Sequence, residues 1–301
     1  MKTKRTSKQP VVPVRHMKFD FNPSKAPKYC WDNNSWGSAF ILTFSAFIPA
    51  GERFVIDAVR EFRDKTKDPQ LRERVTGLIG QEAAHSRIHA EFNNMYDVKG
   101  LPINRLAEQS EKIYLKYLLP KVPKKTTLAI AAGIEHVTAI LAEGAFGENI
   151  DSLDKMKGVT RDFLVWHLLE ELEHKSVAFD LYQEIDGSYA HRIAAFIMIW
   201  ALSVPFGIYA LREILKTPGF SQGSRKNLRG QNYFINLTLR SSGKFLSYLR
   251  RDFHPDNLDT NQLLDEWLEN LFGQGGELSE FVTKIITPES KREAVEKRMA
   301  S

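Results

Sequence analysis

Helical periodicity runs through the middle of the chain, between residues 40 and 186. Apolar residues recur there every three or four positions, few glycines or prolines interrupt them, and the alternation of a β-strand is missing. Such spacing places the apolar positions on one face of an α-helix. The pattern predicts four long helices, which span residues 38–65, 69–98, 124–149 and 160–184.

The connections between these helices are short, long and short. Residues 66–68 and 150–159 join neighbouring helices, whereas residues 99–123 form a longer crossover. Two antiparallel helix pairs joined by one crossover have the connectivity of a ferritin-like bundle. We therefore expect an all-α fold, a ferritin-like four-helix bundle with additional C-terminal helices.

A further apolar segment follows the bundle. Residues 193–211 carry no charge, and Arg192 and Arg212 bound them. By length they could just span a bilayer, but Pro205 and Gly207 interrupt them. We interpret the segment first as a buried core helix. The alternative is a membrane-embedded or interfacial helix, which the basic residues that follow would suit.

Three regions therefore follow one another along the chain. Residues 1–30 are expected to form a basic extended arm, residues 31–190 the four-helix metal-binding bundle, and residues 191–301 a helical extension packed on the bundle. In this extension we expect a short amphipathic helix at residues 261–272 and a charged helix that ends near Met299.

Positive charge gathers in two parts of the chain. Residues 1–28 have a net charge of +7 and residues 212–251 of +8, whereas the whole chain carries only +5. The remainder is therefore acidic, and we expect the arm to cover the acidic bundle of its own chain or of a partner in a homodimer. We do not expect nucleic acid as a partner, because neither basic segment shows a helix-turn-helix pattern or interleaved aromatic residues.

Composition and targeting signals indicate a folded cytoplasmic protein. With 43% apolar and 26% charged residues, the chain is neither disordered nor fibrous. Its single cysteine, Cys30, cannot form an internal disulfide, and residues 1–28 contain no apolar secretory signal. Membrane association depends on how the segment at residues 193–211 is placed.

The second and fourth predicted helices each carry three polar residues in the middle of an apolar stripe. These residues are Glu82, His85 and His89 in the second helix and His167, Glu171 and His174 in the fourth. An unpaired carboxylate or imidazole in a bundle core costs several kcal/mol, so each of them needs a strong partner. A metal ion satisfies many such groups at once.

The spacing of these residues is that of metal ligands. The pattern Glu-x-x-His occurs in the chain as Glu82 with His85 and as Glu171 with His174. Residues three apart share a helix face and can bind neighbouring or shared cations. The stripes of the other two helices place Glu52 and Glu135 inward. Four glutamates and two histidines form the donor set of di-iron and di-manganese carboxylate bundles.

We therefore predict a centre of two iron ions, with manganese as an alternative. Zinc is less suited, because structural zinc prefers thiolate ligands and no cysteine is placed here. A buried ion-pair network is the competing interpretation, but no lysine or arginine occupies the matching inward positions. Glu170 competes with Glu171 for the inward place, whereas Glu173 and His136 point about 100° away from the ligands beside them.

His89, Glu143 and His167 are expected to extend the centre in one direction along the bundle. In a ferritin-like topology they all lie on the same side of the predicted ligands, roughly 6 to 12 Å away. Three interpretations follow: groups that hydrogen-bond to the ligands, a seventh ligand from His167, or a third metal ion held by all three residues.

Five stretches carry a resemblance to a known family. They are GERFVIDAVREF (51–62), GQEAAHSRIHAEFN (80–93), IEHVTAILAE (134–143), WHLLEELEHKSVAFDLY (166–182) and YLRRDFHP (248–255). The chain resembles the bacterial family of predicted metal-dependent hydrolases over most of residues 15–270. This resemblance implies a bound metal.

A more distant resemblance concerns the ligand positions. The spacing His-x3-Glu-x2-His at His167, Glu171 and His174 is similar to that of p-aminobenzoate N-oxygenase-type di-iron enzymes. In the order of the chain, Glu52, Glu82 with His85, and Glu135 precede it. The resemblance implies that His167 binds iron and that the centre activates O2.

These features favour a non-haem iron oxidoreductase that uses O2 to oxidise a small organic substrate, such as an aromatic or carboxylate compound. Such an enzyme needs an electron donor, which the sequence does not identify. The first alternative is a metal-dependent hydrolase, in which two cations share a hydroxide. The second alternative is metal storage or sensing without catalysis.

Overall fold

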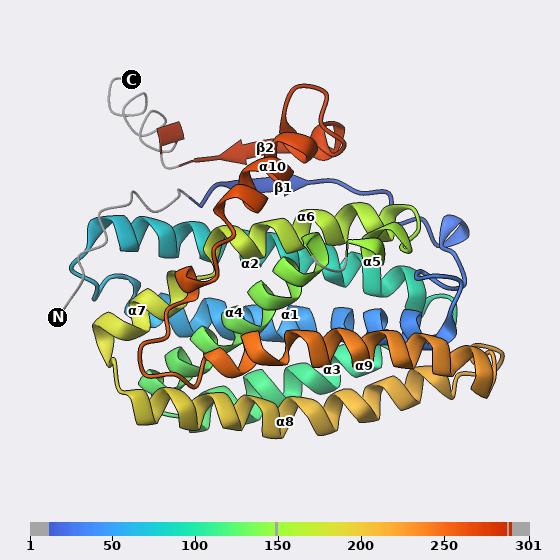
Figure 1. Cartoon of the computed structure of the whole chain (residues 1–301), viewed down its shortest axis with the longest axis horizontal. Helices are drawn as coiled ribbons and strands as arrows, with labels where there is room; N and C mark the ends of the chain where they lie inside the picture. Colours follow the sequence, from blue (N-terminus) through green and yellow to red (C-terminus); the bar gives the residue numbers. More distant parts are fainter. Residues whose placement is uncertain (1–11, 148–149, 288, 291–301) are drawn as a thin grey trace.

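Four helical segments pack around one another as a bundle (Figure 1). The computed structural model describes residues 12–147, 150–287 and 289–290. The segments are α1 (Ser35–Arg63), α2 (Pro69–Asp97), α4 (Lys124–Phe146) and the consecutive helices α6 (Val159–His174) and α7 (Val177–Ile185). α1 packs against α2 and α4, and both α6 and α7 pack against α2 and α4. The prediction of an all-α bundle is confirmed.

Side-chain caps explain where the first two helices begin. The Asn34 side chain accepts a hydrogen bond of 2.9 Å from the Gly37 N–H at the start of α1. At the start of α2, Asp68 accepts one of 2.8 Å from the Gln70 N–H. Pro69 occupies the first turn of α2, where a missing N–H costs nothing. These caps satisfy backbone donors that a helix start leaves without partners.

The fourth predicted helix is interrupted. Instead of one helix over residues 160–184, the chain forms α6 and α7 with Lys175 and Ser176 between them. Both residues are held from outside the helix. Lys175 Nζ donates to the Leu258 carbonyl at 2.6 Å, and Arg74 Nη2 donates to Ser176 Oγ at 2.7 Å. Periodicity could not show this break, because the apolar stripe continues through it.

The crossover from α2 to α4 is itself helical. It consists of α3 (Ile103–Glu111), the π-helical segment η2 (Lys112–Leu118) and η3 (Leu119–Lys121). The shorter elements of the fold are η1 (Pro23–Lys25), α5 (Asp151–Asp154), η4 (Pro255–Asn257) and η5 (Ser279–Phe281). The predicted helix at residues 261–272 is confirmed as α10 (Asn261–Phe272), which packs on α6. The helix expected to end near Met299 lies outside the described residues.

The described part of the N-terminal arm lies along α2. β1 (Val14–Met17) pairs antiparallel with β2 (Val282–Ile286), so segments from both ends of the chain meet over the bundle (Figure 1). Two glycines of α2 make room for the arm. A β-carbon at Gly77 would lie 2.4 Å from the Val12 carbonyl oxygen, and one at Gly80 would lie 2.4 Å from a methyl group of β1. The arm therefore approaches α2 closely enough to require glycine.

Two long helices lie on the side of the bundle opposite β1 and β2 (Figure 1). α8 (Tyr189–Leu215) and α9 (Ser224–Ser247) both pack on α1 and α4. Among the described residues, α1, α4 and α8 are long and apolar enough to cross a membrane. The apolar window is 67% buried in α1 and in α4 but only 17% buried in α8. The interpretation of residues 193–211 as a buried core helix is therefore wrong.

Two clusters of buried apolar residues fill the bundle. One contains Phe92 of α2 and Phe163 of α6. The other contains Leu78 of α2, Leu128 of α4 and Phe179 of α7. Each of the four segments (α1, α2, α4 and α6 with α7) contributes apolar residues to both clusters. Between these two apolar parts, each segment carries polar residues.

Candidate metal centre

The predicted ligands meet at the level between the two apolar clusters. They are Glu52 of α1, Glu82 and His85 of α2, Glu135 of α4, and His167, Glu171 and His174 of α6, each at most 5% exposed. Two groups have one donor atom from every member within 4.8 Å of the others. The first group is Glu82, His85, Glu171 and His174, and the second group is Glu52, His85 and His167. One buried centre thus collects donors from three of the four segments within bonding reach of a common ion.

His85 directs a free nitrogen at three carboxylates. Its Nε2–H donates to Glu170 Oε2 at 2.9 Å, which leaves Nδ1 without a proton in the neutral ring. Three carboxylate oxygens surround Nδ1 at nearly equal distances: Glu52 Oε1 at 3.9 Å, Glu82 Oε1 at 3.9 Å and Glu171 Oε1 at 3.8 Å. A lone pair facing three carboxylates is unfavourable unless a cation lies among them.

A proline one turn before Glu52 starts a chain of hydrogen bonds toward the centre. Pro49 has no N–H, so the Ser45 carbonyl lacks its usual partner in α1. Asn93 Nδ2 donates to this carbonyl at 2.9 Å. The Asn93 amide is thereby oriented with Oδ1 toward the Ser45 hydroxyl, which donates to it at 2.7 Å. The single hydroxyl proton of Ser45 is therefore used.

The direction of this chain determines which ring nitrogen of His89 and of His167 donates a hydrogen bond. Because its proton is used, Ser45 Oγ accepts from His89 Nδ1–H at 2.8 Å. His89 Nε2 then accepts from His167 Nδ1–H at 2.6 Å. Neutral His167 is left with a lone pair on Nε2, 2.7 Å from Glu171 Oε1 and 3.7 Å from Glu52 Oε1. At these distances, nitrogen and carboxylate need a proton or a metal ion between them.

His174 lies between carboxylates on both sides of its ring. Nδ1 lies 2.7 Å from Glu135 Oε2, so in the neutral ring that a metal ligand requires, the single proton donates there. Nε2 then faces Glu82 Oε1 at 3.1 Å and Glu171 Oε2 at 4.0 Å. In this structure Glu135 therefore contacts the outer nitrogen of His174, as carboxylates behind metal-bound histidines do. It belongs to neither group of converging donors.

Several polar atoms of the centre are buried without a hydrogen-bond partner. Among the described residues they include both carboxylate oxygens of Glu52, Glu82 Oε1, His85 Nδ1 and His174 Nε2. Buried polar groups normally have partners, and an unpaired one costs about 1–3 kcal/mol. These atoms converge on one region and are all metal-ligand types. The residues present therefore fit a divalent metal ion.

Without a cation, burial and the charges of neighbouring groups shift the pKa values of the centre. Burial and then the charges of Glu171 and Glu135 raise the pKa of Glu52 well above 4.5. Burial lowers the pKa of His85 well below 6.5. Burial also opposes the charge of His174, but Glu135 and Glu171 raise its pKa to about 9. A bound metal ion would compensate the charges of the buried carboxylates without protonation of the ligands.

Sequence reasoning missed Arg15, which supports the centre from the N-terminal arm. Its guanidinium donates from Nη1 to Glu170 Oε1 at 2.9 Å and from Nη2 to Glu173 Oε1 at 2.7 Å. Glu170 in turn holds His85, so the arm, the carboxylate and the ligand form one line of contacts. Glu170 thus takes a place behind His85 and does not replace Glu171 in the centre. The only sequence signal was the net charge of the arm.

Glu170→Gln should weaken metal binding about 10- to 100-fold, since the carboxylate behind a metal-bound histidine raises its basicity and fixes its orientation. Glu173→Gln is the matched control, because Glu173 bonds to Arg15 but not to His85. Competition with a chromophoric chelator measures both affinities. Equal affinities in the two variants would contradict the assigned role of Glu170.

The predicted position of Glu143 is wrong. Its carboxylate accepts from Lys244 Nζ of α9 at 2.7 and 2.9 Å, away from His89 and His167. The reason is helical geometry: eight residues after Glu135, a side chain is rotated by roughly 80° around the helix. His89 and His167, by contrast, contact each other. A third metal ion held by all three residues is therefore not compatible with the structure.

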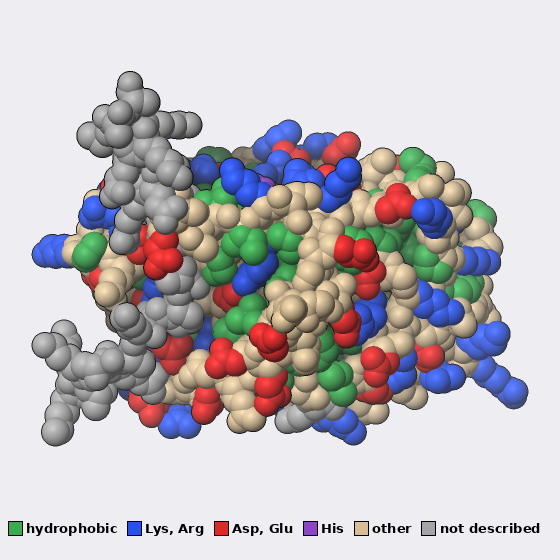
Figure 2. All heavy atoms as spheres, turned by 90° about the horizontal axis from the view of Figure 1, so that it is seen from above, with side chains coloured by type: hydrophobic (Ala, Val, Ile, Leu, Met, Phe, Trp, Pro, Cys, Tyr) green, Lys and Arg blue, Asp and Glu red, His purple; other side chains and the backbone are tan. Residues whose placement is uncertain are grey.

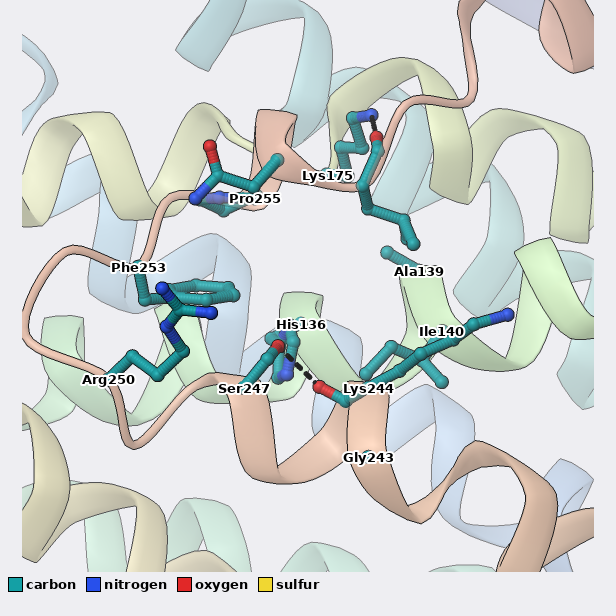
Figure 3. Close-up of a pocket in the computed structure, with 12 residues that line it drawn as sticks. His136, Ala139, Ile140, Lys175, Gly243, Lys244, Ser247, Arg250, Phe253 and Pro255 are labelled. Atoms are coloured by element: carbon teal, nitrogen blue, oxygen red, sulfur yellow. Dashed lines mark hydrogen bonds between the residues drawn. The ribbon is translucent and has the colours of Figure 1, made fainter.

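A cavity of about 440 Å³ lies between α4, α9 and the segment at residues 250–258 (Figure 3). His136, Lys175, Lys244 and Arg250 are among the residues that line it, and none of the predicted ligands is. Its three cationic side chains already bond to carbonyl or carboxylate oxygens of this chain. His136 points about 100° away from the neighbouring ligand position, so the cavity is separate from the centre.

Fold and centre together define the class: an all-α bundle protein with a buried histidine–carboxylate cluster that could hold metal. A family model described as a predicted metal-dependent hydrolase matches residues 13–259. Since this is more than half of the chain, the chain belongs to that family. No curated protein and no solved structure matches it. The likeness to p-aminobenzoate N-oxygenase-type enzymes stays a prediction.

Proposed function

We propose that this protein is a metal-dependent hydrolase that holds two divalent cations between α1, α2 and α6. Three histidine nitrogens, each directed at carboxylate oxygens in a sealed core, carry this proposal. The carboxylate of Glu171 lies between two of these histidines: Oε1 lies 2.7 Å from His167 Nε2, and Oε2 lies 4.0 Å from His174 Nε2. A carboxylate between two histidines of this kind suits a pair of neighbouring cations.

The assigned roles of the protein groups follow from their contacts. Bound cations would lower the pKa of water and polarise an ester, amide or phosphoester bond. His85, His167 and His174 would hold the cations through the nitrogens that face the carboxylates. Glu170, His89 and Glu135 accept hydrogen bonds from the N–H groups on the opposite sides of these rings and keep the three rings oriented. The apolar clusters on both sides exclude bulk water from the centre.

A second candidate is an O2-activating iron oxidoreductase. The specific observation in its favour is the donor set, which combines carboxylates and imidazoles with no thiolate. Such hard donors suit iron, and carboxylates can change their binding mode as iron changes oxidation state. In this candidate the same contacts would hold the same histidines. The substrate would be a small organic molecule, and an electron donor would be required.

One comparison separates the two functions. The hydrolase should turn over ester, amide or phosphoester substrates when loaded with redox-inert Zn²⁺ or Mg²⁺ in the absence of O2. His174→Ala should abolish this turnover, and Glu143→Gln, outside the centre, should preserve it. Anaerobic loading with Fe²⁺ followed by O2 should produce transient visible absorption only in the oxidoreductase. An O2 reaction without hydrolysis in any metal form would overturn our first proposal.

A further inference from the structure

The outward stripe of α8 is apolar along nearly its whole length. Ala194, Ile197, Ala201, Val204 and Ile208 follow one another at helical spacing, and all are exposed. Ile197 is 60% exposed and Ile208 is 49% exposed. A helix face that contacts water normally carries charged or polar residues. The stripe is thus built like a face that contacts an apolar partner.

α9 continues this surface with a second apolar stripe. Leu228, Ile235, Leu239 and Leu246 are each at least 45% exposed and are separated by seven, four and seven residues. α8 and α9 lie beside each other, with the rings of Trp200 and Phe245 in contact. We call these two exposed apolar stripes together the α8–α9 face. Such large exposed apolar patches mark interaction sites.

Aromatic residues of α1 lie between the two helices. On α1, Phe40 stacks on Phe234 of α9, and Phe47 stacks on Phe206 of α8. Phe44 lies between these positions on the same helix and is 38% exposed. The apolar surface therefore extends from one helix to the other.

Basic residues exceed acidic ones beside the α8–α9 face. Nine lysines and arginines lie between residues 212 and 251, where Glu213 is the one acidic residue. Three of these cations, Arg229, Lys244 and Arg250, pair with carboxylates outside this segment. Arg225, Arg229 and Arg240 are exposed on α9. On the other side, η2 contacts α8 through a hydrogen bond from Tyr114 to Ser203, and η2 exposes Lys112 and Lys116. By contrast, the opposite face of the molecule mixes acidic and basic side chains (Figure 2).

We propose that the α8–α9 face docks the protein onto the surface of an anionic lipid bilayer. Apolar residues enter the boundary between headgroups and acyl chains, and the surrounding cations contact the acidic headgroups. α8 lies in the plane of the membrane and does not span it, because Phe196, Ala210 and Ile214 pack it lengthwise onto the bundle. A second copy of the chain is disfavoured as the occupant, because it would bring two positive faces together.

Flotation with lipid vesicles tests this docking. The full-length, metal-loaded protein should partition at least about tenfold more strongly into vesicles of phosphatidylcholine with phosphatidylglycerol than into phosphatidylcholine alone. The triple variant Ile197→Gln, Ile208→Gln and Leu239→Gln should lose at least about tenfold of this binding. Arg225→Gln combined with Lys226→Gln should also lose about tenfold. Val98→Gln, at a 59% exposed position outside both helices, is the matched control and should bind like the wild type.

Two results would overturn the proposal. One is equal binding of the wild type and the triple variant to anionic vesicles. The other is a wild-type dimer in solution that the triple variant converts into a monomer, which would assign the face to a second copy. Circular dichroism and metal content of every variant show whether it is folded. Because docking does not depend on the reaction, its failure would leave the proposed function untouched.

Discussion

Arg15→Gln should lower the free energy of unfolding by about 3–5 kcal/mol, the usual loss when one partner of a buried ion pair is removed. Arg15 is 6% exposed and is bonded to Glu170 and Glu173, which are also buried. Both carboxylates already have pKa values raised by burial, although Arg15 partly offsets this. Without the guanidinium, two buried carboxylates would repel each other.

The comparison requires a control from the same arm. Lys18 is exposed next to β1, so Lys18→Gln should change the free energy of unfolding by no more than about 0.5 kcal/mol. Urea denaturation of the wild type and both variants, followed by circular dichroism, measures the difference. If Arg15→Gln were as stable as Lys18→Gln, the arm would not be an integral part of the fold.

The inward residues of the bundle could be predicted because helical spacing alone determines which face they share. Glu82 and His85 lie three positions apart, and Glu171 and His174 repeat this spacing. Four helices with such stripes pack around a common axis, and their inward donors are therefore expected to lie close together. His89 lies seven residues after Glu82, which rotates it by only about 20° from the same face.

Contacts between distant segments could not be predicted in this way. Arg15 and Glu173 are 158 residues apart, and only the folded arm brings them together. The pairing of β1 with β2 likewise depends on short strands with no clear alternation. The prediction for Glu143 is wrong for a different reason. The side chain points from α4 toward α9, where Lys244 binds its carboxylate. The burial of α8 could not be predicted either, because an apolar sequence of that length is compatible with a helix in the core and with a helix on an exposed face.

His174→Ala should reduce the bound metal per chain and remove most of the stability gained from metal. His174 Nε2 and Glu82 Oε1 lie 3.1 Å apart, and neither atom has a hydrogen-bond partner. In the wild type, free metal at about 1,000 times its dissociation constant should stabilise the fold by about 4 kcal/mol. Elemental analysis and thermal unfolding with and without a chelator measure both effects, and Glu143→Ala is the control outside the centre.

The pH dependence of this gain has a definite sign. Burial and neighbouring carboxylates raise the pKa values of Glu52 and Glu82 well above 4.5 in the metal-free fold. The folded state then holds more protons than the unfolded state, so the stability contributed by these groups is lost as pH rises above 4.5. Metal replaces those protons, and the difference between loaded and stripped wild-type protein should grow with pH. In His174→Ala the difference should stay small at every pH; an undiminished metal content and gain would exclude His174 as a ligand.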